Sequence, residues 1–299
     1  MVVISIIVLY DCNLKNAKTL NSLKENFFAT PNAFADFHTI IYDNGSINQG
    51  KGIDFPFEYR YIHKSDNEGL AVAYNFALKE GVKKAFKWLL LLDQDSILPH
   101  SFIYDLLEDI QSCQSKSNIV GLVPRMGVDG FNFSPSKVLP GGVHRPIDHN
   151  QIGISKSEIF AIGSGSLVNI SFMRSVNGFN ELFWLDSLDR WLFMKIYKEG
   201  KNVFVTKSVV EHDLSIMDYG KSVSAKRYNN IMVYETIFMM LYKSKSDNII
   251  YIIRLIKRLL FFAIDVKKWK YFLLTYEHLK SLIFQSKDQI IKSYKRRER

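Results

Sequence analysis

The chain has 299 residues, of which 47% are apolar and 23% charged, and its formal net charge is +9. A chain of this length with so many apolar residues can bury a large core, so the composition excludes a disordered protein. Cys12 and Cys113 stand far apart with no other Cys or His at ligand spacing, which excludes a disulfide framework and a zinc site. This use of cysteine fits a reducing cytosol.

The chain begins with the apolar run MVVISIIVLYDCN, which lacks a basic leader and a small-residue cleavage pattern. These features predict a first buried strand rather than a signal peptide. No window reaches the roughly 18 apolar residues of a membrane-spanning helix. We therefore expect a cytoplasmic protein that does not span the membrane.

Strand and helix patterns alternate along the first hundred residues. The expected strands and helices cover, in chain order, residues 1–10 (strand), 16–28 (helix), 38–42 and 59–63 (strands), 69–87 (helix) and 88–92 (strand). Repeated βα units of this kind predict an α/β fold with a mainly parallel central sheet. They are typical of the nucleotide-binding half of an α/β protein.

The middle of the chain is rich in Gly, Pro and Ser. Residues 118–157 predict irregular loops around a site, and 159–170 a strand region interrupted by Gly163, Ser164 and Gly165. The pattern then predicts a helix and a further strand, at residues 188–199 and 202–210, with the α/β body closing near Asp213. We expect one domain at 1–218 and a helical region at 219–299.

The C-terminal region carries the positive charge. Residues 220–299 hold 18 Lys and Arg against 6 Asp and Glu, a net charge of +12, whereas residues 1–219 hold 21 against 24, a net charge of −3. Segment 248–276 interleaves aromatic and aliphatic residues with Lys and Arg, as basic amphipathic helices at an anionic membrane surface do. The alternative is a helical subdomain that packs on the body and exposes a basic face. No nucleic-acid reader motif accompanies the charge, so we expect no nucleic-acid partner.

The run WLLLLDQDS at 88–96 ends a buried strand with two carboxylates, Asp93 and Asp95. The carboxyl ends of strands are where α/β sheets bind ligands. Side chains two apart on an extended segment point the same way, so this pair can share one hard cation, which a metal-bound diphosphate would supply. The alternative is a strand end in which Asp and Ser bond local backbone groups without a cation.

Further polar residues fall near the same edge of the predicted sheet. Asp43, in DNGS, either forms a turn or accepts the imide N–H of a uracil or thymine base. In NEGLAVAYN, Gly69 permits close backbone approach, and Asn75 is expected to orient neighbouring loops or the nucleotide. The chain lacks GxGxxG and GxxxxGK[ST], which argues against a dinucleotide oxidoreductase and a P-loop phosphotransferase.

Three candidate catalytic or metal-binding residues follow. Asp186 and Asp189 lie at the entry to the helix at 188–199, where each could simply cap or start the helix. A carboxylate beside apolar residues could instead have a raised pKa and act as a general base. His212 follows a strand and either is structural or completes a metal shell with Asp95.

Six motifs stand in the order and approximate spacing of family 2 glycosyltransferases: YDC, IYDNGS, NEGLAVAYN, LLLLDQDS, GSGSL and GFNELFWLDSLD. Over residues 3–215 the chain most resembles bacterial rhamnosyltransferase-like members, because DQDS matches their version of the DxD motif. The resemblance implies a GT-A fold that binds a nucleotide-sugar and Mg²⁺ or Mn²⁺ and inverts the anomeric centre.

The resemblance also implies residue roles. The metal ligands would be Asp95 and His212, and the catalytic base Asp186 or Asp189, with Asp186 favoured because it matches the first acidic position of the family's loop. Asn180 and Lys195 depart from the Asp and Arg that relatives often have. The implied donor-binding residues, with Asp43 at the base and Asp93 at the ribose or sugar, are Tyr10, Asp43, Asn67, Gly69, Asn75, Asp93 and Gln94.

These features predict an inverting, metal-dependent glycosyltransferase at the inner face of the cell membrane. It would transfer a sugar, with rhamnose favoured, from a dTDP- or UDP-sugar to a lipid-linked saccharide during O-antigen, capsule or exopolysaccharide synthesis. Similar motifs also serve galactofuranosyl and other hexosyl transfer. A nucleotidyltransferase lacks support because no glycine-rich, basic triphosphate loop is evident near the N-terminus. An inactive relative serving as a membrane-bound assembly module is the other alternative, and the intact DQD and Asp186 argue against it.

Overall fold

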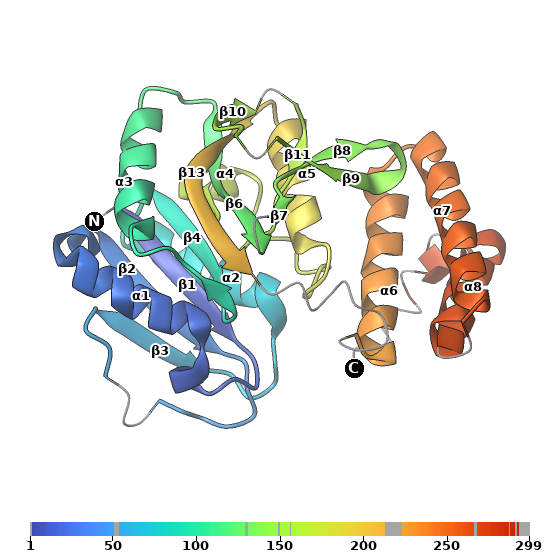
Figure 1. Ribbon diagram of the computed structural model, residues 1–299, viewed down its shortest axis with the longest axis horizontal. Helices are drawn as coiled ribbons and strands as arrows, with labels where there is room; N and C mark the ends of the chain where they lie inside the picture. Colours follow the sequence, from blue (N-terminus) through green and yellow to red (C-terminus); the bar gives the residue numbers. More distant parts are fainter. Residues whose placement is uncertain are drawn as a thin grey trace. The chain divides into compact units, whose positions relative to one another are not determined.

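The structure is a computed structural model that describes residues 2–50, 54–128, 131–148, 150–155, 157–212, 223–265, 268–286, 288–290 and 292. It divides into two compact units (Figure 1). The sheet unit comprises Met1–Lys137 and Arg145–Asp213, and the helical unit comprises Val138–His144 and Leu214–Arg299. The predicted domain boundary at 218/219 lies outside the described residues and stays a prediction.

The sheet unit is built on one large sheet with the strand order β10–β13–β6–β12–β4–β1–β2–β3, to which β5 is added through β13 and β7 through β6. The neighbours β3, β2, β1 and β4 run parallel, as do β6 and β13, while β12 is antiparallel between β4 and β6. The strands are β1 (Val3–Leu9), β2 (Phe37–Asp43), β3 (Tyr59–His63), β4 (Trp88–Asp93), β5 (Ser96–Ile97), β6 (Ile119–Val128), β7 (Phe131–Ser134), β10 (Gly153–Ser155), β12 (Leu167–Asn169) and β13 (Asn202–His212).

A second, smaller sheet has the order β11–β8–β9, formed by β8 (Ser136–Leu139), β9 (Val143–Pro146) and β11 (Ile159–Phe160). The helices of the sheet unit are α1 (Lys18–Ala29), α2 (Gly69–Lys83), α3 (Phe102–Cys113), α4 (Ile170–Ser175) and α5 (Leu188–Lys198). Short 3₁₀ helices cover Leu14–Asn16, Pro31–Asp36 and Pro140–Gly142. The predicted α/β architecture with long parallel ladders is confirmed.

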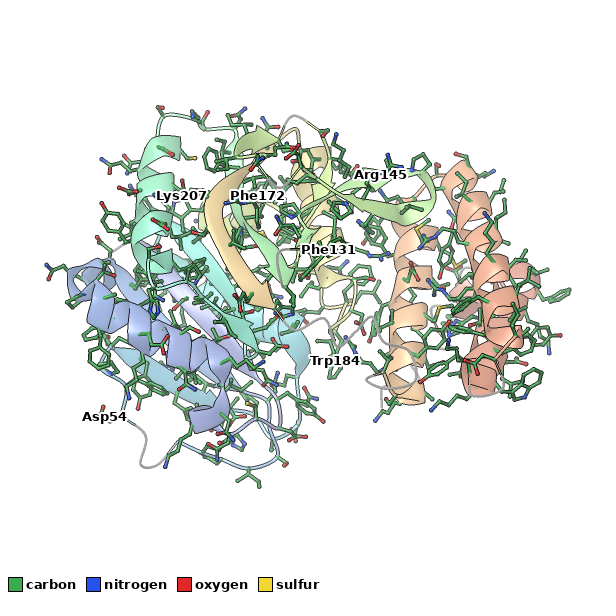
Figure 2. The ribbon with its side chains drawn as sticks, in the orientation of Figure 1. Asp54, Phe131, Arg145, Phe172, Trp184 and Lys207 are labelled. Atoms are coloured by element: carbon green, nitrogen blue, oxygen red, sulfur yellow. The ribbon has the colours of Figure 1, made fainter. Side chains whose placement is uncertain are left out.

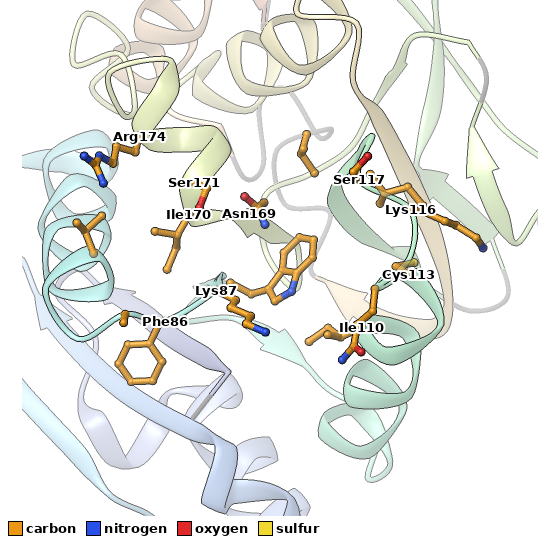
Figure 3. Close-up of a pocket in the computed structure, with 16 residues that line it drawn as sticks. Phe86, Lys87, Ile110, Cys113, Lys116, Ser117, Asn169, Ile170, Ser171 and Arg174 are labelled. Carbon is orange, nitrogen blue, oxygen red and sulfur yellow. The ribbon is translucent and has the colours of Figure 1, made fainter.

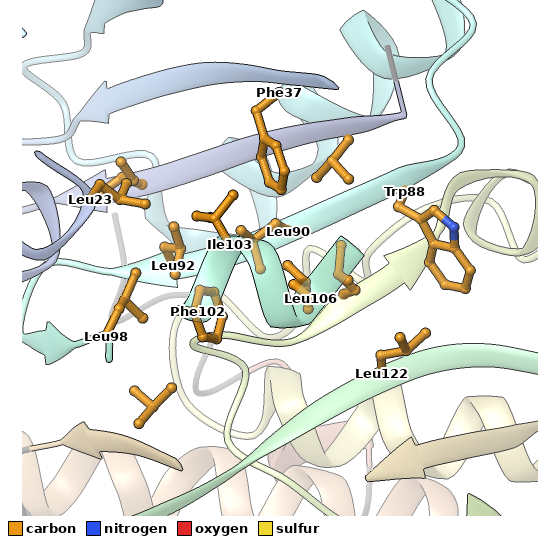
Figure 4. Packing of buried hydrophobic residues seen from close by; sticks show 14 of the residues in the cluster. Leu23, Phe37, Trp88, Leu90, Leu92, Leu98, Phe102, Ile103, Leu106 and Leu122 are labelled. Atoms are coloured by element: carbon orange, nitrogen blue, oxygen red, sulfur yellow. The ribbon is translucent and has the colours of Figure 1, made fainter. Parts of the chain in front are cut away.

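Helices cover both faces of the sheet, which explains the uninterrupted apolar run of β4. On one face, Trp88, Leu90 and Leu92 of β4 join a core with residues of α1 and α3, shown in Figure 4. On the other, Leu89 and Leu91 are equally inaccessible to solvent, and α2 packs on β1 and β4. A strand buried on both faces has no polar alternation, so its polar end stands out in the sequence.

Several elements differ from the sequence predictions. Helices α3 and α4 lie in stretches for which we predicted no helix, and five strands, β6 to β10, lie within 118–157, which we predicted to be irregular. Gly121, Pro124 and Gly127 within β6 resemble strand breakers, but Pro124 lies where the pairing of β6 with β13 is irregular, a position that strands allow for proline. The predicted strand region 159–170 is correct only in part, because it forms two short strands, β11 and β12, separated by a turn.

The helical unit contains α6 (Ala225–Tyr242), α7 (Lys245–Ala263) and α8 (Trp269–Phe284), which pack side by side (Figure 1). Its centre is aromatic: the ring of Tyr228 meets those of Phe262 and Tyr271 at centroid distances of 5.8 and 5.2 Å. The predicted C-terminal helical region is therefore confirmed. Among the described residues, no helix combines the length and apolar character needed to cross a membrane.

Asp109 on α3 generates a test of stability. Its carboxyl group is buried, and among the described residues its Oδ2 atom has no hydrogen-bond partner. Burial raises the pKa of Asp109 to about 6, an effect that Lys207 opposes. Because the folded protein holds this proton more tightly than the unfolded chain does, the ionised carboxylate lowers stability above about pH 6, and this penalty vanishes below about pH 4.

We expect Asp109→Asn to raise Tm by about 2–4 °C at about pH 8 and to leave it unchanged at about pH 4, as measured by thermal melts. Glu108→Gln is the matched control, because Glu108 is an exposed neighbour that pairs with Lys207, labelled in Figure 2, at 2.8 Å. This pairing lowers the pKa of Glu108, so its substitution should reduce Tm at the higher pH. An equal loss of Tm at both pH values in Asp109→Asn would contradict the assignment.

Candidate active site

Parallel pairing brings the polar ends of several strands to one edge of the sheet. In the register, Leu9 of β1 lies beside Asp43 of β2, and Val8 lies beside Asp93 of β4. Asp43 and Asp93 therefore flank the end of β1, although fifty residues separate them in sequence. This is the edge at which α/β sheets bind ligands.

A network of buried hydroxyl groups holds the turn Asp93–Gln94–Asp95. The Ser164 hydroxyl accepts a hydrogen bond from the Asp93 backbone N–H at 3.0 Å and lies 2.7 Å from the Ser96 hydroxyl. Thr19 of α1 accepts from the Ser96 N–H at 3.1 Å and donates to the Asp93 carbonyl. The two carboxylates thus stand on a turn whose backbone is anchored on two sides.

Asp93, Asp95 and His212 form a cluster that could hold a metal ion. Each side chain offers one ligand atom, and these atoms lie within 4.8 Å of one another. His212 ends β13 next to β5, and its Nδ1 atom is 3.0 Å from the Ser96 hydroxyl and 3.6 Å from Asp95 Oδ1. Two carboxylates and an imidazole suit a divalent cation such as Mn²⁺ or Mg²⁺.

The electrostatics of the pair also fit a cation. Burial, followed by the charge of Asp95, raises the pKa of Asp93 to about 6, whereas His212 and the hydrogen bond from Tyr74 oppose the rise. Two adjacent carboxylates that are partly removed from water repel each other, and a divalent ion would relieve this repulsion.

Asp189 lies on the first turn of α5 and is fixed toward the same site. Its Oδ2 atom accepts a hydrogen bond from the Gly163 N–H at 3.0 Å. Burial is the largest cause that raises the pKa of Asp189 to about 7, and the charges of Asp93 and Asp186 add to it. Asp186 is half-buried in the turn before α5, where Ser187 has a left-handed backbone with φ of 63°.

The loop before α5 packs on the start of α2, which explains NEGLAVAYN. Gly69 has φ of 84°, and a Cβ atom there would lie 2.4 Å from the Trp184 ring, which is labelled in Figure 2. The Trp184 indole donates to the Asn67 carbonyl at 3.2 Å. Asn75 accepts from the Phe179 N–H at 2.7 Å and donates to its carbonyl at 2.9 Å.

These contacts bear out one of the two roles that we predicted for Asn75, because its side chain orients the loop at 178–181. The other role of Asn75, orientation of the nucleotide, stays a prediction. Donor binding by Asn67 and Gly69 also stays a prediction. In the structure, the three residues support the loop that leads to Asp186 and Asp189.

The remaining predicted donor residues surround the carboxylate turn. Gln94 accepts from the Tyr10 backbone N–H at 2.8 Å, and the Tyr10 side chain is half exposed. Asp43 is fully buried; its carboxylate accepts hydrogen bonds from Gly45 N–H at 2.8 Å and from the Tyr61 hydroxyl at 2.6 Å. Burial and the bond to Asp43 raise the pKa of Tyr61 to about 12, so Tyr61 remains a donor.

Sequence analysis missed the residues that support the carboxylates. Thr19, Ser96, Ser164 and Gly163 carry no catalytic signature, and their partners lie up to 116 residues away along the chain. A signal for two of them was present in GSGS at 163–166, where small polar residues interrupt an apolar region.

A hollow of about 610 Å³ lies at the opposite edge of the sheet, near the starts of β4 and β6 (Figure 3). Its floor includes Trp88 and Ile110, and its charged lining residues are Lys87, Lys116 and Arg174. None of its lining residues carries a carboxylate or an imidazole, and the candidate metal ligands lie at the carboxylate edge instead.

The fold and the carboxylate site define an α/β protein with a candidate metal site, and comparison with known proteins names the family. The model of "Glycosyl transferase family 2" matches residues 5–177, more than half of the chain. The chain therefore belongs to glycosyltransferase family 2 and is a glycosyltransferase. A search of curated proteins finds no match.

Two solved structures of S. aureus TarS share the fold. One is 15% identical, with a TM-score of 0.53, and the match covers 83% of this chain and 41% of TarS. The other, TarS 1–349, is 14% identical, with a TM-score of 0.52, and the match covers 94% of this chain and 92% of that one. The chain thus spans less than half of the longer TarS structure, and the likeness confirms the predicted GT-A fold.

The contact between Gly163 and Asp189 generates a test of the site. A Cβ atom at 163 would lie 2.6 Å from Asp189 Oδ1, so alanine must displace the carboxylate. We expect Gly163→Ala to lower kcat about 100-fold, the effect of a displacement of about 1 Å in a catalytic group.

Gly121→Ala is the matched control, since its Cβ atom would meet no atom closer than the 3.4 Å of an ordinary contact. Steady-state kinetics with comparable melting temperatures would check the pair. Equal activity of the two variants would show that the position of Asp189 is unimportant.

Proposed function

We propose that the protein is an inverting, metal-dependent glycosyltransferase that moves a sugar, with rhamnose favoured, from a nucleotide-sugar to a hydroxyl of a lipid-linked glycan. The observation that carries this proposal is the cluster Asp93, Asp95 and His212, with the half-buried Asp189 near Asp93. The cluster suits a metal-bound diphosphate, and Asp189 suits proton removal from an acceptor. The sugar rests on the resemblance of DQDS to rhamnosyltransferase-like sequences.

The metal ion would be Mg²⁺ or Mn²⁺, held by Asp95 and His212 as the sequence predicted, with Asp93 as an additional ligand. When bound, it supplies positive charge that stabilises the departing diphosphate. Ser96 contacts the His212 ring and Ser164 holds the Asp93 backbone, so these hydroxyls orient the ligands. Orientation of this kind sustains metal affinity.

We assign the catalytic base to Asp189 in preference to Asp186, which the sequence favoured. The Gly163 N–H fixes one oxygen of Asp189, and the raised pKa makes the carboxylate a stronger proton acceptor near neutral pH. In this arrangement the oxygen of the acceptor hydroxyl attacks the anomeric carbon while Asp189 takes the hydroxyl proton. The bond between the anomeric carbon and the diphosphate breaks at the same time. Asp186 would orient the loop or the acceptor.

Donor binding is proposed for the edge formed by Tyr10, Asp43 and Gln94. Three hydrogen bonds to Asp43, from Gly45, Tyr61 and Gln49, fill most of the acceptor positions of its carboxylate. We therefore propose that Asp43 acts mainly by shaping the base pocket. The nucleotide would be dTDP or UDP.

A lipid-linked acceptor would place the enzyme at the inner membrane face, and O-antigen, capsule or exopolysaccharide synthesis would supply such acceptors. The basic helical region supports this location, since its net charge would attract anionic lipid. Galactofuranosyl or another hexosyl transfer is the alternative within the family. The cluster of Asp93, Asp95, His212 and Asp189 argues against an inactive assembly module. It contains the candidate metal ligands and the candidate base that the transfer reaction needs.

Thermal stabilisation by nucleotides tests the donor and metal assignments. We expect one of UDP, dTDP, GDP and CDP to raise Tm with Mn²⁺, by about 5–10 °C when ligand is at about 100 times Kd, because only the native state binds it. dTDP would point to rhamnose, and UDP to galactofuranose or a hexose.

Asp95→Ala should abolish this metal-dependent shift while its Tm without ligand stays close to that of the wild type. Asp105→Ala, on α3, is the control that removes an acidic residue outside the site. An unchanged shift in Asp95→Ala would refute the metal assignment, and no shift with any nucleotide in the wild type would favour the inactive module.

The base assignment predicts a pH profile. Because protonated Asp189 cannot accept a proton, kcat/KM should fall about tenfold per pH unit below a pKa of about 7. Asp189→Asn should lower kcat by about 10²–10⁴-fold and remove this limb, whereas Asp186→Asn should keep it. Rates measured against a soluble acceptor across this pH range decide between them, and loss of the limb only in Asp186→Asn would reverse the assignment.

A further inference from the structure

Helix α7 exposes its apolar side to solvent. Ile249, Ile253, Ile256, Leu260 and the following Ile264 recur at intervals of three or four residues and are each between 42% and 86% exposed. This spacing places them on one side of the helix. A helix of a soluble protein normally presents polar residues to solvent, whereas α7 has this exposed apolar stripe in addition to its buried apolar residues Tyr251, Leu255 and Phe262.

Two partly buried arginines lie beside the buried side of α7. Arg254 and Arg258 each approach the buried Glu235 of α6 at 3.7 Å. Arg254 also donates to the Gly141 carbonyl at 2.6 Å, and Tyr251 and Leu255 complete the buried side. These contacts fix the rotation of α7 and hold its apolar stripe outward.

Helix α8 repeats the arrangement. Its buried residues are Tyr271, Thr275 and His278; the Tyr271 hydroxyl donates to the Val223 carbonyl at 2.6 Å, and Thr275 lies 2.6 Å from the Tyr228 hydroxyl. Its exposed large residues, between 47% and 78% accessible, are Trp269, Leu273, Tyr276, Ile283 and Phe284. We call the exposed apolar residues of α7 and α8, with Ile264, the outer face.

Lysines accompany the outer face. Lys257 and Lys280 are exposed, and within the described part of the chain neither forms an ion pair. The two helices contain only two acidic residues, Asp247, which caps the start of α7, and Glu277. The outer face therefore combines apolar and aromatic side chains with uncompensated positive charge.

We propose that the outer face docks on the anionic surface of a lipid bilayer, with α7 and α8 lying along the membrane plane. Their aliphatic side chains would enter the boundary of headgroups and acyl chains, Trp269 and Tyr276 would lie among the headgroups, and the lysines would meet anionic phosphates. The inference rests on the proposed function in one respect, since a lipid-linked acceptor gives the enzyme a reason to dock there.

Charge complementarity favours a bilayer over a second copy of the chain. A two-fold interface places the same patch on both subunits, so it would bring Lys257 and Lys280 toward like charges with few acidic partners. An anionic bilayer compensates these charges instead. The inward arginines are already paired with Glu235 and take no part in docking.

The experiment measures co-sedimentation of the full chain with phosphatidylcholine vesicles that contain or lack phosphatidylglycerol. We expect binding to the anionic vesicles, and a loss of about 100-fold in affinity for Ile256→Glu/Leu260→Glu because two apolar side chains no longer insert. Phe28→Glu is the matched control, since Phe28 is 65% exposed on α1 of the sheet unit, and its affinity should match that of the wild type.

A second variant tests charge without touching the apolar stripe. Lys257→Glu/Lys280→Glu should lose most of the preference for phosphatidylglycerol, and its substitutions are exposed enough to leave folding intact. Thermal melts of both variants establish that they fold. Unchanged binding by either folded variant would overturn the proposal.

Sedimentation velocity without lipid separates the bilayer from a second copy. If Ile256→Glu/Leu260→Glu converts a dimer to a monomer but binds vesicles normally, the outer face is an interface between copies and the proposal is wrong. Vesicle binding needs neither donor nor acceptor, so it fails independently of the glycosyltransferase proposal. Nucleotide-induced stabilisation of the same variants reports on that proposal separately.

Discussion

The candidate active site depends on the buried contact between Ser96 and Ser164. It links the turn after β4 to the turn before β12, and through Ser96 it reaches His212 on β13. Parallel pairing alone would bring the strand ends to one edge, but it would leave Asp93 and Asp95 free to turn away from each other. Buried hydroxyl groups need hydrogen-bond partners, and Ser164 and Thr19 find them in the backbone on either side of Asp95. The network therefore holds the turn that carries both carboxylates, despite their repulsion.

Different neighbours give similar residues different properties within this site. Asp95 lies beside His212, where the two can share a cation, whereas loss of water and the charge of Asp93 raise the pKa of the half-buried Asp189 to about 7. The Gly163 N–H opposes that rise and fixes the direction of the carboxylate. The metal ligand and the base that we propose are therefore the same residue type in different surroundings.

The helical unit uses a buried charge for orientation. Glu235 attracts Arg254 and Arg258, and their inward position leaves the apolar stripe of α7 in solvent. Burying charge seldom adds stability over an apolar core, but removing one partner would leave the others uncompensated. The ion cluster thus selects the rotation of α7 in which the apolar stripe faces solvent.

The sequence by itself determined the class of fold, the carboxylate pair and the family motifs, because buried strands, DQDS and the Gly- and Asn-containing turns are local patterns. It did not reveal β6, since Pro124 and two glycines look like breakers until β13 provides the irregular pairing that accepts them. Nor did it favour Asp189, the base that we propose, because the contact with Gly163 comes from a segment more than twenty residues away. Likewise, the net charge of the last eighty residues was readable, but only tertiary packing around Glu235 decided which side of α7 faces outward. Contacts between distant segments set burial and orientation, and no local pattern encodes them.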